Sequence, residues 1–169
     1  MGLAFAAALG AVGPAAAGGD RDFFRKIEGT WSGPGQIIAG KYKGTRFNCT
    51  LDGSSIKRRP GMMLEGTCRV GLFSQSVSAR IERRGRSYKG SFLDGAKGKG
   101  LDVVAGNVTE DRVTVSMQRE ALNGAMVTRL KPNGKLGVTV SVRVGEDYVP
   151  VIGIDLARAL DRTAVGSTR

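Results

Sequence analysis

The two cysteines, Cys49 and Cys68, are the residues of this chain best suited to covalent or metal chemistry. They lie too far apart for the CxxC spacing of a dithiol redox site. The chain has no histidine to supply the further ligands that a zinc site would need. The same absence excludes Ser–His and Cys–His nucleophile pairs. A structural disulfide is the role that fits both cysteines.

The placement of the cysteines around a turn favours the same role. Cys49 lies on the apolar face of a predicted strand over 43–52, and Cys68 lies on the apolar face of the next, over 62–70. The basic tip at 58–59 is midway between them, and residues equidistant from the centre of an antiparallel hairpin lie opposite each other. We therefore predict a cross-strand disulfide, which is typical of exported proteins.

The carboxylates do not add a catalytic site. Glu28, Asp52, Glu65 and Asp102 are isolated in the sequence, and their spacing gives no reason to pair them. With no histidine and no nucleophile motif, we expect a protein that is not an enzyme. The same residues predict no metal ion and no cofactor.

Alternation of apolar and polar residues dominates the chain from Trp31 to Ile154, as half-buried strands require. Turn signals, among them Asn123-Gly124 and Asn133-Gly134, interrupt the alternation at short and regular intervals. The predicted strands cover 31–39, 43–52, 62–70, 73–83, 87–93, 101–107, 112–119, 125–131, 135–144 and 148–154.

This pattern predicts an all-β fold, an antiparallel up-and-down β-barrel of eight to ten strands, because closure leaves no strand edge unpaired. Short helices are predicted on either side of the strands, over 20–27 and 155–162. One domain over 20–162 contains all of these elements, and 163–169 are predicted to form a flexible tail.

The first residues resemble a targeting segment. An apolar run from Leu3 to Val12 is followed by small residues, which predicts a signal peptide over 1–17. The alternative interpretation is a flexible tail rich in alanine and glycine. The run is too short to cross a bilayer as a helix. Together with the cysteines, it predicts an exported protein of the bacterial periplasm or cell envelope.

The tripeptide Gly29-Thr30-Trp31, which follows a predicted short helix, resembles the G-x-W motif of the lipocalins and the wider calycin superfamily. The resemblance implies a barrel that holds a small apolar ligand, with Trp31 plugging one end beneath a late arginine. Arg158 is the best match for that arginine, and Arg143 is the second. The alternative is that Trp31 is a core tryptophan of another kind of β domain.

An apolar or amphipathic ligand would contact the inward faces of the strands. The mouth of the barrel would then lie opposite the helix, near 40–44 and 94–100. The inward residues predicted to line the ligand site are Trp31, Phe47, Leu64, Phe73, Val77, Phe92, Val115 and Val138.

The formal charge of +11 is concentrated in particular turns. In a ten-stranded meander alternate turns share one end, and that end would collect a basic rim. The residues of this basic rim are Lys57, Arg58, Arg59, Arg83, Arg84, Arg86, Lys131 and Lys135. A basic rim attracts anions such as lipid headgroups and acidic polysaccharides; the alternative is a solvated surface that only keeps the barrel soluble.

Three functions follow from these features. The first is a non-catalytic binding protein that holds an apolar ligand, and the second is an envelope module that docks anionic lipid or polysaccharide through the basic rim. The third is an inhibitor that presents a turn to a secreted enzyme. Nucleic acid is not expected as a partner, because the chain has only one Trp, three Tyr and six Phe to stack on bases.

Overall fold

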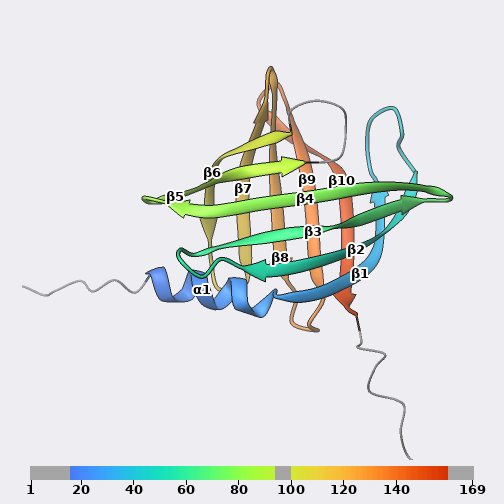
Figure 1. Cartoon of the computed structure of the whole chain (residues 1–169). Coiled ribbons are helices and arrows are strands. Elements are labelled where there is room, and N and C mark those ends of the chain that lie inside the picture. The colour runs from blue at the N-terminus through green and yellow to red at the C-terminus, as the bar shows by residue number, and fades with distance from the viewer. Residues whose placement is uncertain (1–15, 94–99, 160–169) are drawn as a thin grey trace, which may run out of the picture.

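The computed structural model describes residues 16–93 and 100–159, which form a closed antiparallel barrel (Figure 1). Each strand pairs with its neighbours in the chain, and β1 pairs with β10 to close the barrel. The strands are β1 (Gly29–Ile37), β2 (Arg46–Ser55), β3 (Gly61–Val70), β4 (Phe73–Arg84), β5 (Ser87–Leu93), β6 (Leu101–Val108), β7 (Arg112–Arg119), β8 (Leu122–Leu130), β9 (Leu136–Val144) and β10 (Asp147–Arg158). The predicted all-β, up-and-down barrel is confirmed, with ten strands.

The up-and-down order gives the barrel two different ends. The helix α1 (Ala16–Lys26) leads directly into β1, so it marks the end that we call the helix end. The turns β2–β3, β4–β5, β6–β7 and β8–β9 lie at this end. The remaining turns lie at the opposite end, which we call the free end and at which no described helix lies.

Helix α1 covers the helix end and confirms the helix predicted over 20–27. Phe23, Phe24 and Ile27 form one apolar face and are fully buried against the barrel. Arg25 and Lys26 occupy the last turn, where positive charge is favourable beside the helix carbonyls. Gly29 then turns the chain into β1 with a φ of 102°, a value that favours glycine.

The predicted helix over 155–162 is wrong for its described part. Asp155 to Arg158 continue β10, with Arg158 opposite Trp31 and Leu156 fully buried. The segment has a helical spacing of apolar residues, but β1 would be left with an unpaired edge if β10 ended earlier. Closure of the barrel therefore overrides the local pattern. Residues 160–162 lie outside the described residues.

One of the two predicted Asn-Gly turns is also wrong. Asn133-Gly134 lies in the β8–β9 turn, where Gly134 has a φ of 73°. Asn123 and Gly124 instead lie within β8, where Gly124 pairs with both neighbouring strands. The β7–β8 turn is formed three residues earlier, by Glu120 with a φ of 51° and Ala121.

The predicted disulfide is present in the ladder between β2 and β3. Cys49 and Cys68 are register partners, and their sulfur atoms are 1.99 Å apart. The signal peptide predicted over 1–17 falls mostly on 1–15, outside the described residues, while 16 and 17 begin α1. The tail predicted over 163–169 also lies outside them. Within the described part of the chain, no helix has the length and apolar character to cross a membrane.

Candidate functional site

The floor of the barrel is built around Trp31 at the helix end. Its side chain is 1% exposed, and its indole nitrogen donates a hydrogen bond to the Ile27 carbonyl at 2.9 Å. The Arg158 guanidinium lies over the indole ring, 4.6 Å from its centroid. Arg158 also donates to the carbonyls of Glu28 and Lys26, at 2.6 and 2.5 Å. Strand β10 and the end of α1 are thus joined through one cation stacked on one aromatic ring.

This geometry agrees with the arginine chosen from the sequence. Arg158 is at the helix end and contacts Trp31, whereas Arg143 is at the free end and donates to the Gly145 carbonyl at 3.1 Å. Arg143, the second match, therefore has no contact with the tryptophan.

The Asp20 carboxylate joins α1 to strands β4 and β5. The Asp20 carboxylate accepts a hydrogen bond from the Tyr88 hydroxyl at 2.7 Å and one from Arg83 at 3.1 Å. The Tyr88 ring is 2% exposed and packs on Phe24, with ring centroids 5.7 Å apart. Burial, and secondly the bond to Asp20, raise the pKa of Tyr88 far above its usual value of 10.0. Tyr88 therefore stays a neutral donor.

On β2, β4, β5, β9 and β10, exposure of the inward side chains increases from the helix end toward the free end, whereas the inward residues of β7 are buried along its whole length. On β4, Ile81 is 4% exposed, Val77 is half-buried and Phe73 is 83% exposed. The same order holds on β5, where Tyr88 is buried and Phe92 half-buried. The same order is found on β2 (Leu51, Phe47), β9 (Leu136, Val140) and β10 (Leu156, Ile154).

This gradient has a simple geometric cause. Strands shield an inward side chain from the side, so its exposure must come through an end of the barrel. Helix α1 and Trp31 cover the helix end, and the half-buried residues lie farther from it. Solvent therefore reaches an apolar wall from the free end, as in a ligand site that is lined by hydrophobic side chains.

The residues predicted to line a ligand site separate into three groups. Trp31 and Val115 belong to the closed core, because they are 1% and 0% exposed. Phe73 is a correction: it follows the β3–β4 turn and its ring lies in solvent, not inside the barrel. The residues that remain on the half-buried wall are Phe47, Leu64, Val77, Phe92 and Val138.

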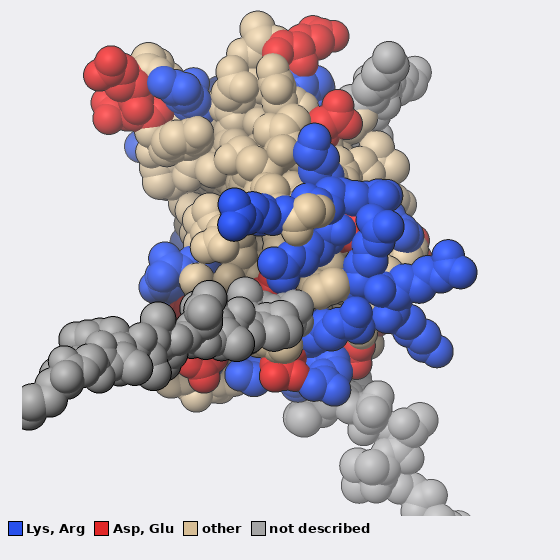
Figure 2. Space-filling view, turned by 90° about the vertical axis from the view of Figure 1, so that its left-hand side faces the viewer, with Lys and Arg blue, Asp and Glu red and all other residues tan. Residues whose placement is uncertain are grey.

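The basic rim is at the helix end, as the alternation of turns predicts. The backbone N–H of Arg83 donates to the Pro60 carbonyl at 2.8 Å, so the β2–β3 turn lies beside the end of β4 that leads into the β4–β5 turn. Figure 2 shows the resulting cluster of Lys and Arg on the side where these two turns lie. The rim residues that form no ion pair within the described part of the chain are Lys57, Arg58, Arg59, Arg86 and Lys135.

Three predicted rim residues have structural partners instead. Arg83 is 25% exposed at its side chain and holds Asp20 of α1. Arg84 pairs with Glu82, and Lys131 pairs with Asp155. Because these cations already have carboxylate partners, they are less suited to an external anion than the residues of the β2–β3 turn that are unpaired within the described part of the chain.

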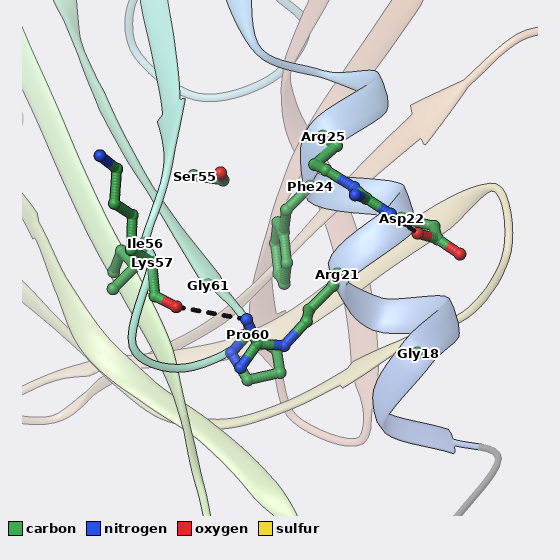
Figure 3. Close-up of a pocket in the computed structure, with 10 residues that line it drawn as sticks. All are labelled: Gly18, Arg21, Asp22, Phe24, Arg25, Ser55, Ile56, Lys57, Pro60 and Gly61. Atoms are coloured by element: carbon green, nitrogen blue, oxygen red, sulfur yellow. Dashed lines mark hydrogen bonds and ion pairs between the residues drawn. The ribbon is translucent and has the colours of Figure 1, made fainter.

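A small pocket of about 200 Å³ lies between α1 and the β2–β3 turn. Figure 3 shows Arg21 reaching across it, and its guanidinium donates to the Lys57 carbonyl at 3.2 Å. Arg25 is at its edge, in an ion pair with Asp22, and the Phe24 ring forms part of its wall. The pocket thus combines cations with an apolar wall at the helix end.

A second, larger hollow of about 500 Å³ lies along β1, β2 and β10. Pro34, Gln36 and Asn48 contribute to it from positions that alternate with the inward residues, so it is a groove on the outer surface. Ile38 and Arg46 line the part of this groove near the free end.

The described residues offer no group of three or more Cys, Asp or Glu side chains placed to bind a metal ion. Glu28 accepts hydrogen bonds from the Ser55 hydroxyl and backbone, and Asp52 accepts one from Thr30. These two carboxylates therefore have structural partners within the barrel.

One prominent feature was not predicted from the sequence: apolar side chains lie in solvent at the free end. The large hydrophobic residues exposed at or beside the turns of that end are Ile38, Tyr42, Val70, Leu72, Phe73, Leu93, Leu122, Val144, Tyr148 and Val149. An apolar residue inside a predicted turn, such as Leu72 after Gly71, is the signal that would have shown it.

The fold has a counterpart among solved structures. The chain is similar to the crystal structure of Rv2717c from M. tuberculosis, with a TM-score of 0.56 and 13% sequence identity. The match covers 79% of this chain and 93% of that one. At this identity the likeness concerns the barrel fold. No known family matches the sequence, and no curated protein does.

Proposed function

We propose that this protein is an exported, non-catalytic, calycin-like barrel that binds a small apolar or amphipathic ligand through its free end. The observation that carries the proposal is the gradient of exposure along the inward faces of β2, β4, β5, β9 and β10. A filled core would bury Val77, Phe92 and Val140 as completely as it buries Ile81, Tyr88 and Leu136. Their partial exposure supports a wet apolar wall, from which a ligand would displace water.

The floor supports the calycin-like part of the proposal. An N-terminal helix that leads into Gly29-Thr30-Trp31, with Arg158 stacked on Trp31, matches what the resemblance implies. The Cys49–Cys68 disulfide is compatible with export, because such bonds persist in oxidising compartments.

A pair of tryptophan substitutions on one strand tests the ligand site. Val140 points inward and is half-buried, while its neighbour Thr139 points outward and is exposed. Val140→Trp should occupy space in front of the apolar wall and so weaken binding of a fluorescent linear fatty acid by roughly tenfold or more. Thr139→Trp adds the same bulk on the outer face and should leave the dissociation constant unchanged.

The fatty acid is measured by fluorescence titration, and circular dichroism establishes that both variants fold. The proposal fails if the wild-type protein does not bind the fatty acid, or if both variants bind it as the wild-type protein does.

A second candidate function is docking of an anionic envelope polymer by the basic rim. The exposed cations of the β2–β3 turn support it, since Lys57, Arg58 and Arg59 have no ion-pair partner among the described residues. The double reversal Arg58→Glu/Arg59→Glu should weaken binding of dextran sulfate by roughly tenfold or more. Lys89→Glu/Arg143→Glu makes the same change of charge at exposed residues outside the rim and serves as the matched control. Equal loss in both variants would mean that net charge, not the rim, governs binding.

A further inference from the structure

Two turns at the free end carry exposed apolar side chains side by side. The register of β2 and β3 pairs Asn48 with Arg69, so the β1–β2 turn and the β3–β4 turn leave the barrel next to each other. We call this region the apolar-basic tip, and it consists of 38–46 and 69–73. Its large apolar residues are Ile38, Tyr42, Val70, Leu72 and Phe73.

The exposure of these side chains is greatest at the β3–β4 turn. Leu72 is fully exposed and Phe73 is 83% exposed, while Tyr42 is 63% exposed. The turn consists of Gly71, with a φ of 56°, and Leu72. Gly71 supplies the positive φ that this two-residue turn needs, and the turn does not require a large apolar side chain at Leu72. A cluster of large apolar residues in solvent marks a surface that another phase or molecule covers.

The charges of the tip have one sign. Lys41, Lys43, Arg46 and Arg69 are all exposed, and neither 38–46 nor 69–73 contains an acidic residue. These four cations form no ion pair within the described residues. The Lys41 amine lies 5.5 Å from the centre of the Tyr42 ring, so cation and aromatic ring share one surface.

We propose that the apolar-basic tip inserts into the interface of an anionic lipid bilayer. Leu72 and Phe73 would enter the boundary of the acyl chains, and the Tyr42 ring would lie at the depth of the headgroups. The lysines and arginines around them would contact the lipid phosphates. The absence of carboxylates in the tip supports this partner, because a negative surface attracts every charge in it.

Two alternatives fit these observations less well. In a symmetric dimer through the tip, the same four cations would face their own copies and repel them. The basic rim at the helix end has cations, but the described residues of its turns include no exposed large apolar side chain. The rim therefore suits adsorption by charge alone, whereas the tip combines charge with side chains able to insert.

The inference does not depend on the ligand proposed above, because the inserting residues lie outside the barrel wall. Membrane insertion would, however, supply a source for the ligand proposed above. Phe73 follows the turn that borders the free end, so insertion would bring the barrel opening to the bilayer surface, where amphipathic molecules reside.

Sedimentation with lipid vesicles tests the inference on the full chain. The vesicles contain either phosphatidylcholine alone or an equal mixture with phosphatidylglycerol, and each is measured at low and high salt. We expect the wild-type protein to bind the anionic vesicles and to keep part of that binding at high salt. Leu72→Ser/Phe73→Ser should reduce the partition coefficient roughly tenfold or more, because it removes the inserted apolar area.

Charge reversals at the two ends separate the tip from the rim. Lys41→Glu/Lys43→Glu should weaken vesicle binding, while Arg58→Glu/Arg59→Glu should leave most of it. The inference is overturned if the wild-type protein does not bind anionic vesicles, or if Leu72→Ser/Phe73→Ser binds them normally. It is also overturned if only the rim variant loses binding.

Two further readouts keep the conclusions distinct. Analytical ultracentrifugation would overturn the inference in favour of a second copy if the wild-type protein dimerises and Leu72→Ser/Phe73→Ser does not. Fatty-acid titration of this same variant should give the wild-type dissociation constant. Vesicle binding without fatty-acid binding would contradict the ligand proposal alone, and the reverse result would contradict only the inference about the tip.

Discussion

The two ends of this barrel are built from the same ten strands, yet they differ in almost every physical property. At the helix end, aromatic side chains are buried, Arg158 is stacked on Trp31, and α1 is bonded to the barrel through Asp20. At the free end, inward residues of five strands are half-buried and apolar side chains of the turns lie in solvent. The contrast indicates that the packing contacts that stabilise the fold are concentrated at the helix end. The free end contributes fewer of them and leaves apolar surface available for binding.

The largest expected difference between the ends concerns one aromatic residue from each. Trp31→Ala should reduce the free energy of unfolding by about 3–5 kcal/mol, because it leaves a cavity beneath Arg158 and α1. Phe73→Ala should change it by about 0.5 kcal/mol or less, since its ring is 83% exposed. Urea denaturation of both variants measures the two values. Equal losses would show that the ends do not differ in stability.

The disulfide provides the next largest effect. It joins β2 to β3 across a sequence separation of 19 residues. Replacing both cysteines, Cys49→Ala/Cys68→Ala, should lower the free energy of unfolding by about 3 kcal/mol in the chain-entropy model. The fatty-acid dissociation constant should change less, because the ladder of β2 and β3 still holds Phe47 and Leu64 in the apolar wall. A variant that stays equally stable would show that the disulfide does not restrain the unfolded chain.

The smallest effect concerns the bond between Tyr88 and Asp20. Tyr88→Phe should cost about 1–2 kcal/mol near neutral pH, because the carboxylate loses a buried donor. The raised pKa adds a dependence on pH. Below pH 10.0 Tyr88 is neutral in both states; above it the unfolded chain ionises first, so the stability of the wild-type protein falls.

The difference between Tyr88→Phe and the wild-type protein should therefore narrow as the pH rises above 10.0. Urea denaturation at several alkaline pH values measures it. A difference that stays constant over this range would mean that the pKa of Tyr88 is the same in the folded and unfolded chains.

Much of the barrel follows from the sequence because its signals are local. Apolar alternation identifies strands such as Leu136–Val144, and Asn133-Gly134 marks a turn. The symmetric placement of Cys49 and Cys68 about the tip at 58–59 also predicts their pairing, since hairpin register is set by the turn.

The remaining features depend on contacts between distant parts of the chain. Strand β10 extends through Arg158 because β1 needs a partner, which the local sequence does not reveal. The anchoring of Asp20 by Tyr88 joins residues separated by 68 positions. Phe73 has the parity of the inward residues of β4, so the alternation predicted that it lines the wall. It directly follows the two-residue β3–β4 turn, beyond the part of the strand that faces the interior, and its ring therefore lies in solvent.

The most direct test of the account is native mass spectrometry of the protein recovered from its source cells without denaturation. We expect a discrete added mass of roughly a few hundred daltons, the size of a ligand that such an apolar wall holds. Organic extraction should remove it, and protein carrying Val140→Trp should lack it, while Thr139→Trp should retain it. A polypeptide of bare mass that also fails to bind added fatty acid would contradict the claim that the free end admits a ligand.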